Sequence, residues 1–88
     1  VFSDDINWCK ENFKHIENIY FVENEKDYVE MYLMSLCRNN IISNSSFSWW
    51  GAWLNRNSNK IVIGPSKWFG PFIQHNTGDI LPENWIKI

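Results

Sequence analysis

The chain of 88 residues contains no long apolar run and no block of charge of one sign. No apolar stretch approaches the roughly 20 residues that a helix needs to cross a bilayer, and the first residues do not follow the basic-then-apolar order of a signal peptide. Eight basic and ten acidic residues give a formal net charge of −2. This balance argues against a nonspecific nucleic-acid or membrane-surface binder, because such a protein would present a basic face.

Cysteine and histidine are scarce. Cys9 and Cys37 stand far apart without a CxxC pair, and we interpret both as buried thiols of a reducing compartment, with a disulfide as the alternative. His15 and His75 have no cysteine or histidine at metal-ligand spacing beside them. The sequence therefore predicts no metal site.

Recognisable nucleotide-binding loops and internal repeats are also missing, since the chain has no P-loop and no G-x-G-x-x-G motif. Its apolar and aromatic residues, 44% and 17% of the chain, suffice for a packed core and argue against disorder. The length indicates one small domain or a piece of one. Because residues 1–3 resemble the tail of a strand, we expect the chain to be truncated at its N-terminus.

Short apolar runs alternate with helical patterns along the chain. Helical spacing predicts helices over residues 7–14 and 27–37, and a third, aromatic helix begins at one of the candidate caps from Asn44 to Ser46. The predicted strands are residues 1–3, 19–22, 41–43 and 60–63, with residues 85–88 as a further short edge strand. This order predicts an α/β fold: a partial Rossmann-like parallel sheet of about four strands, with helices on both faces.

The polar ends of these strands form the candidate ligand site. In parallel α/β sheets ligands bind outside the carboxyl ends of the strands, and here those ends carry carboxylates, hydroxyls and Lys67. Between Asn44 and Ser46 a strand runs into a helix N-terminus, where unpaired N–H groups and the helix dipole favour an anion. The alternative is a well-capped helix that binds nothing. The chemistry suits a nucleotide better than an apolar ligand.

Three of the six tryptophans follow in the predicted third helix. Trp49 and Trp53 share one side of it at i and i+4, while Phe47, Trp50 and Leu54 share another. We interpret these stripes as core rather than as a sugar-stacking platform. Gly51 is predicted to let this helix lie close to the sheet.

Residues 41–55, IISNSSFSWWGAWLN, resemble the signature of the glycosyltransferase family 11 α-1,2-fucosyltransferases. Further segments extend the resemblance, in order, over essentially the whole chain: Phe2-Ser3-Asp4-Asp5 with Trp8 and Cys9, residues 32–37, residues 60–63 with 67–69, and Asp79-Ile80 with Pro82 and Trp85-Ile86. One family feature is absent, an H-x-R-x-D-like motif that supplies an arginine for the donor diphosphate.

The resemblance implies that residues 1–88 are a single C-terminal, nucleotide-sugar-binding portion of a two-domain transferase of the GT-B type. Such enzymes invert the anomeric carbon and transfer fucose from GDP-fucose to the 2-hydroxyl of a galactoside without a required metal or other cofactor. The implied partners are this donor, a glycan acceptor and the N-terminal domain of the same enzyme. Without that domain and the arginine motif, the chain alone is predicted to be inactive.

The resemblance also assigns donor contacts. Asn44, Ser45, Ser46 and Phe47 form a turn that would hold the donor phosphate through hydroxyls and backbone N–H groups. Glu30 stands where family members usually carry an aspartate. Its carboxylate would accept the guanine N1–H and amino group, with a solvated helix carboxylate as the alternative.

Two further carboxylates and one lysine complete the candidate site. Asp4 and Asp5 would contact ribose or fucose hydroxyls of the donor, or would cap the helix that follows them. Lys67 would help to neutralise the diphosphate, or is an ordinary surface lysine. The catalytic base is not identified by the resemblance.

Two functions of other classes compete with the transferase. A receiver-like signalling module would explain Asp4, Asp5 and Lys67, but the next predicted strand lacks the aspartate that such a module phosphorylates. A tryptophan-rich carbohydrate-binding module would require an all-β pattern. For location, the resemblance leaves open the bacterial cytoplasm, with or without membrane association, and the Golgi lumen.

Overall fold

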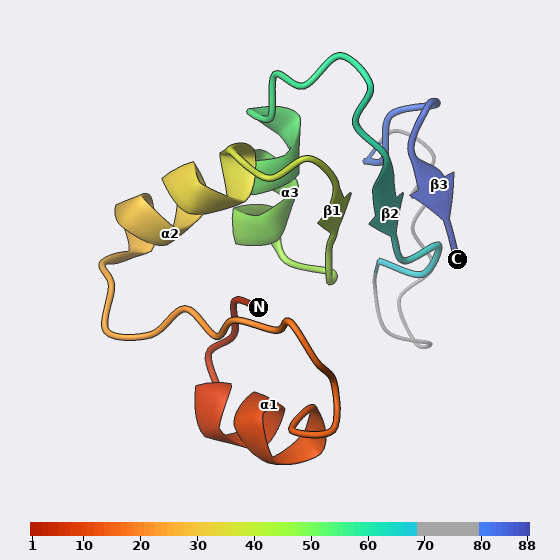
Figure 1. The fold of residues 1–88 in the computed structure, drawn as a ribbon. Helices are drawn as coiled ribbons and strands as arrows, with labels where there is room; N and C mark the ends of the chain where they lie inside the picture. The colour runs from red at the N-terminus through yellow and green to blue at the C-terminus, as the bar shows by residue number, and fades with distance from the viewer. Residues whose placement is uncertain (69–79) are drawn as a thin grey trace. The chain divides into compact units, whose positions relative to one another are not determined.

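The computed structural model describes residues 1–68 and 80–88 (Figure 1). Within them it contains three helices and three strands: α1 (Ile6–Asn12), α2 (Asp27–Ser35), β1 (Asn40–Ile41), α3 (Ser46–Trp53), β2 (Val62–Gly64) and β3 (Ile86–Lys87). The strands form one parallel sheet in the order β1-β2-β3. The α/β prediction is therefore confirmed, with three strands in the described part where we expected about four. None of these helices is long and apolar enough to cross a membrane.

The chain divides into two compact units, Val1–Glu30 and Met31–Ile88, with the boundary inside α2. Each unit is described by itself. His75 and Asp79, which the sequence analysis considered, lie outside the described residues.

The first unit lacks the two strands predicted at residues 1–3 and 19–22, so these predictions are wrong. The N-terminal amino group of Val1 donates to the carbonyl of Tyr20 at 2.7 Å, and the N–H of Val22 donates to the carbonyl of Val1 at 2.9 Å. These two bonds are the pattern of one rung of a parallel ladder. A single rung without a third strand in this unit is too small a pairing to sustain strands.

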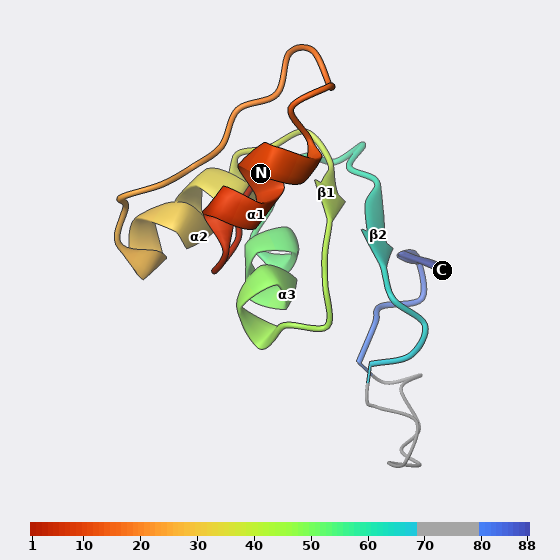
Figure 2. The ribbon, with the colours of Figure 1, turned by 90° about the horizontal axis from the view of Figure 1, so that it is seen from below.

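The second unit is built around a β-α-β connection. β1 leads into α3, and α3 returns the chain to β2 with Asn40 opposite Val62 and Ile41 opposite Ile63. Figures 1 and 2 both show α3 beside β1, the position of a helix that covers a parallel sheet. The core between helix, sheet and C-terminal segment consists of Ile42, Ala52, Val62, Leu81 and Trp85.

The strands are shorter than predicted: β1 covers Asn40–Ile41 where residues 41–43 were expected, and β2 covers Val62–Gly64 where residues 60–63 were expected. The N–H of Ile61 bonds to the side-chain oxygen of Asn39 at 2.8 Å, so β2 begins only at Val62. On the other side of β2, the predicted C-terminal edge strand is confirmed, because β3 pairs with it in parallel through Ile63 and Ile86. The sheet therefore places the carboxyl end of β1 directly before the N-terminus of α3.

Gly51 has a different neighbour from the one predicted. A Cβ atom built on Gly51 would lie 2.9 Å from the Cβ and 3.1 Å from the Sδ of Met34. The missing side chain thus lets α3 approach the last turns of α2, and the prediction that it lets α3 approach the sheet is wrong. The helical pattern identified a face that needed a small residue but not the element opposite it.

We expect Gly51→Ala to destabilise the second unit by about 1 kcal/mol. Overpacking a filled site costs about 1–3 kcal/mol, and the higher helix propensity of alanine offsets roughly 1 kcal/mol of this. Urea unfolding followed by tryptophan fluorescence measures the difference. A variant as stable as the parent, or more stable, would show that α3 and α2 do not approach this closely.

Candidate functional site

Residues 44–47 lead from β1 into α3, and we call them the serine turn. This turn is held together by serine side chains. Ser45 is the N-cap of α3, and its Oγ accepts the N–H of Ser48 at 3.4 Å. The hydroxyl of Ser48 lies within donating distance of two carbonyls, those of Ser43 at 3.3 Å and Ser45 at 3.0 Å. The predicted cap is confirmed, and these bonds fix the backbone of the turn from the inside.

The outer side of the same turn carries free donors. α3 begins at Ser46, and no described residue accepts a hydrogen bond from the N–H of Ser46 or Phe47. The Ser46 side chain is exposed, as is that of Asn44, whereas Phe47 is half-buried. Two free N–H groups at the positive end of a helix dipole are the local chemistry that favours an anion.

Asn44 connects this turn to the segment that follows β2. Its Nδ2 donates to the carbonyl of Trp68 at 3.2 Å, so the carboxyl ends of two neighbouring parallel strands meet at one place. Lys67, next to Trp68, is exposed. The structure thus brings the predicted turn and the predicted lysine to the same edge of the sheet, where α/β proteins bind their ligands.

The tryptophans of α3 divide into a packed one and two half-exposed ones. The rings of Trp49 and Trp53 stack with centroids 5.2 Å apart, as i and i+4 spacing predicts. Trp49 also packs against the core, and its Nε1 donates to the carbonyl of Ile80 at 2.7 Å. Trp50 and Trp53 are 48% and 51% exposed. The prediction of a core stripe therefore holds for Trp49 and is wrong for the other two.

The remaining predicted site residues belong to the first unit. Asp5 caps α1, because its carboxylate accepts the N–H of Trp8 at 3.1 Å. Asp4 is exposed and has no hydrogen bond or ion pair with any described residue. Glu30 is half-buried in the first turn of α2, where a carboxylate complements the helix dipole. The capping alternative is confirmed for Asp5, and donor contacts of Asp4, Asp5 and Glu30 stay predictions.

An asparagine network that was not predicted lies in the second unit at the edge of the sheet where β1 begins, opposite to the serine turn. Asn55 is 4% exposed, and its Nδ2 donates to the carbonyl of Cys37 at 2.6 Å and to Oδ1 of Asn40 at 2.8 Å. Asn40 in turn donates to the carbonyl of Met34 at 2.9 Å. The network ties the end of α3 to the start of β1 and the end of α2. The sequence does contain asparagines on both sides of α3, at residues 39–40 and 55–59. Such residues are typical of loops, and for that reason they did not indicate a buried network.

Lys60 closes the same end of α3. Its Nζ donates to the carbonyls of Ala52 and Asn55, both at 2.8 Å, and lies 6.0 Å from the centre of the Trp85 ring. A cation at a helix C-terminus pairs with unsatisfied carbonyls and with the dipole. Desolvation by burial lowers the pKa of Lys60 below its ordinary 10.5.

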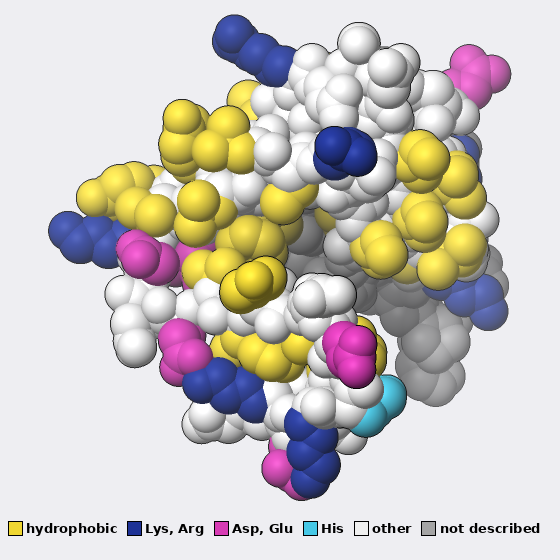
Figure 3. Space-filling view, in the orientation of Figure 1, with side chains coloured by type: hydrophobic (Ala, Val, Ile, Leu, Met, Phe, Trp, Pro, Cys, Tyr) yellow, Lys and Arg dark blue, Asp and Glu magenta, His cyan; other side chains and the backbone are white. Residues whose placement is uncertain are grey.

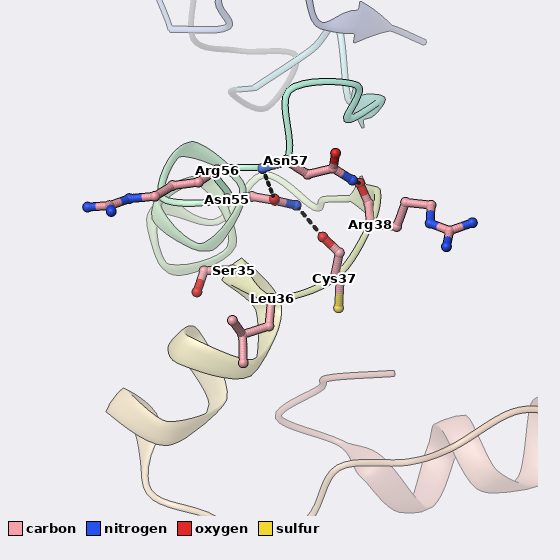
Figure 4. Close-up of a pocket in the computed structure, with 7 residues that line it drawn as sticks. All are labelled: Ser35, Leu36, Cys37, Arg38, Asn55, Arg56 and Asn57. Atoms are coloured by element: carbon pink, nitrogen blue, oxygen red, sulfur yellow. Dashed lines mark hydrogen bonds between the residues drawn. The ribbon is translucent and has the colours of Figure 1, made fainter.

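An open hollow of about 470 Å³ lies beside this network, opposite to the serine turn along α3 (Figure 4). It is lined by Ser35, Leu36, Cys37, Arg38, Asn55, Arg56 and Asn57. The two arginines were not among the residues predicted to act. No cluster of potential metal ligands occurs among residues 1–68 and 80–88.

Both cysteines in this structure are free thiols, as predicted, and no disulfide joins them. Cys9 is buried in α1, whereas Cys37 is only half-buried, so the prediction of burial is wrong for the second. The Sγ of Cys37 lies 3.4 Å from the carbonyl of Leu33, which it reaches as a weak donor.

Comparison with known proteins gives a family match over residues 1–88, to the family described as "Glycosyl transferase family 11". The chain is 45% identical to "O-antigen biosynthesis glycosyltransferase WbnK" of Escherichia coli and 46% identical to "Alpha-1,2-colitosyltransferase" of Escherichia coli. The whole of this chain aligns with each, but it covers only 29% and 31% of their respective lengths. No solved structure shows a significant match to the chain.

Proposed function

Because the chain belongs to glycosyltransferase family 11, we propose that it is the donor-binding portion of an inverting α-1,2-fucosyltransferase. The donor is GDP-fucose, and the acceptor is the 2-hydroxyl of a galactoside. The sheet is part of a Rossmann-like half of a GT-B-type enzyme, which the remaining chain of the longer protein completes. The family match over the whole chain argues against the receiver and carbohydrate-binding alternatives.

The serine turn is the observation that carries this proposal. The free N–H groups of Ser46 and Phe47 and the exposed hydroxyl of Ser46 supply donors for one phosphate of the diphosphate. The Ser45 hydroxyl already accepts the N–H of Ser48, but its proton is left to donate to the ligand. Asn44 holds the turn beside Lys67 through Trp68, so a cation stands near to share the remaining charge.

The carboxylates supply recognition of the rest of the donor. Glu30 accepts the guanine N1–H and amino group, and Asp4 accepts hydroxyls of the ribose or fucose. Asp5, already engaged as the cap of α1, uses its second carboxylate oxygen for the same purpose. We place the enzyme in a bacterial cell that builds surface polysaccharide. Both relatives are Escherichia coli proteins, and one is named for O-antigen biosynthesis.

A second candidate function has one specific observation in its favour. A relative with 46% identity is named for α-1,2 transfer of colitose, so colitose competes with fucose as the transferred sugar. The serine turn is proposed to contact the phosphate and not the sugar, and it serves either donor equally. Competition between the two nucleotide sugars for the intact enzyme separates the two functions.

Ser46→Pro tests the role of the turn. Proline is favoured at the first position of a helix and removes only the N–H there, and Ser45 before it already has the extended backbone that proline requires (φ −128°, ψ 128°). The fold is thus preserved, while the phosphate loses the N–H of residue 46 together with the Ser46 hydroxyl, and each hydrogen bond to a charged group is worth about 1.5–3 kcal/mol. We expect GDP to bind at least about tenfold more weakly to the variant.

The measurement is a GDP titration followed by backbone amide NMR signals. In the parent chain we expect the shifts to cluster at residues 43–47. Ser46→Ala, which removes the hydroxyl but keeps the N–H, is the matched control and should weaken binding less than Ser46→Pro. Equal GDP affinity of the proline variant and the parent, or shifts centred elsewhere, would contradict the assignment of the turn.

A further inference from the structure

The hollow beside the asparagine network is lined by two arginines, whereas the serine turn offers hydroxyl and N–H groups. Arg38 follows the end of α2, Arg56 follows the end of α3, and both line this hollow. Both side chains are exposed, and neither guanidinium has an ion-pair or hydrogen-bond partner among the described residues. Two unpaired guanidinium groups at one open site indicate an anionic partner.

The charge distribution along the chain supports this partner. The first unit has three basic and eight acidic residues, a formal charge of −5, whereas the second has five basic and two acidic residues, a charge of +3. No aspartate or glutamate occurs between Glu30 and Asp79. The overall charge of −2, which alone argues against a membrane-surface binder, is therefore the sum of two units of opposite sign.

The directions of the two arginines decide between a small anion and an extended one. In Figure 4 the side chains of Arg38 and Arg56 leave the hollow on opposite sides and point away from each other. A single phosphate or carboxylate held by two arginines needs them to converge. Diverging guanidinium groups instead suit a surface with many separate negative charges.

Apolar side chains accompany these charges. Leu36 lines the hollow and is 62% exposed. Figure 3 shows hydrophobic side chains gathering over α2, where Tyr32 is 63% exposed. Exposed leucine and tyrosine beside arginine are typical of segments that bind at the headgroup layer of a bilayer. A nucleic acid would instead require a denser row of basic residues.

We propose that the face formed by Leu36, Arg38 and Arg56, the arginine face, docks on an anionic phospholipid membrane. The arginines contact lipid phosphates, and Leu36 enters the headgroup layer. This face lies at the amino end of β1 and the serine turn lies at its carboxyl end, so docking leaves the turn open. The inference uses different residues from the proposed function and does not rest on it.

Vesicle co-sedimentation of the 88-residue chain tests the proposal. We expect it to bind vesicles of phosphatidylglycerol and phosphatidylcholine more strongly than vesicles of phosphatidylcholine alone, with an affinity that falls as salt is raised. An arginine near an anionic surface contributes about 1 kcal/mol, which corresponds to about fivefold in partitioning. Arg38→Gln with Arg56→Gln should therefore lower partitioning about 25-fold.

Lys87→Gln is the control for position, because it removes one positive charge, as each arginine substitution does, from an exposed residue of the same unit, in β3. We expect it to change partitioning less than twofold. The proposal is overturned if the parent chain binds neutral and anionic vesicles equally, if the double arginine variant binds like the parent, or if Lys87→Gln reduces binding as much as the double variant. Circular dichroism checks that the variants keep the helices of the parent.

Discussion

Leu81→Ala is expected to destabilise the second unit by about 2–5 kcal/mol. Leu81 is only 2% exposed and belongs to the core with Val62 and Trp85. Its two Cδ atoms lie 3.4 Å from the position of a Cβ on Gly64, so the side chain fills the space over β2 that the glycine leaves. Removing it creates a cavity at the middle strand, where the surrounding backbone is held by pairing on both sides.

Urea unfolding measures this loss through the fluorescence of the tryptophans. Leu54→Ala is the matched control, since Leu54 is 49% exposed and its truncation removes little buried area. We expect the control to cost less than about 1 kcal/mol. If both leucine variants unfolded at the same urea concentration, the C-terminal segment would not contribute to the core.

Asn55→Ala is expected to cost about 2–6 kcal/mol. The change removes the donor for two acceptors, the carbonyl of Cys37 and Oδ1 of Asn40, and each buried group left unsatisfied costs about 1–3 kcal/mol. In the parent, every buried side-chain nitrogen and oxygen of the described residues has a partner. The variant therefore leaves two acceptors without a donor in a network where every buried group had a partner.

Asn59→Ala is the control for the network. Asn59 belongs to the same loop but is exposed, and its side chain bonds to none of the described residues, while its backbone N–H donates to Oδ1 of Asn57. We expect less than about 0.5 kcal/mol for this change. Thermal unfolding compares the two variants, and equal melting temperatures would show that the network around Asn55 does not stabilise the fold.

Local patterns predicted the helices well. α1, α2 and α3 lie within two residues of their expected starts, because apolar spacing and capping residues act over a few neighbouring positions. Asp5 and Ser45 behave as caps for the same reason. The family was likewise apparent from a continuous motif, residues 41–55.

Features that depend on distant partners were not predictable. The apolar runs at residues 1–3 and 19–22 have the composition of strands, but a strand needs a neighbour, and the first unit supplies only the bonds of Val1. Gly51 shows the same limit, since its spacing does not reveal that Met34 lies opposite. Asparagines such as Asn55 are typical of loops, and only the fold makes them a buried network.

The candidate site is predictable to the extent that it is local. The turn from Asn44 to Phe47 was found from its residue types, and its internal bonds follow from the cap. The contact of Asn44 with Trp68 depends on how the ends of β1 and β2 meet, which spacing alone does not reveal. Arg38 and Arg56 were missed because residues on different loops share a hollow only after folding.

The bonds at both ends of α3 have a kinetic consequence. Ser45 and Ser48 hold its first turn, and Lys60 holds its last carbonyls, without any ligand. An anion that reaches the first turn thus meets donors that are already in position, and the turn itself does not have to rearrange to bind it. Association at this site should be a single step whose rate follows ligand concentration linearly, with affinity changes expressed in the dissociation rate.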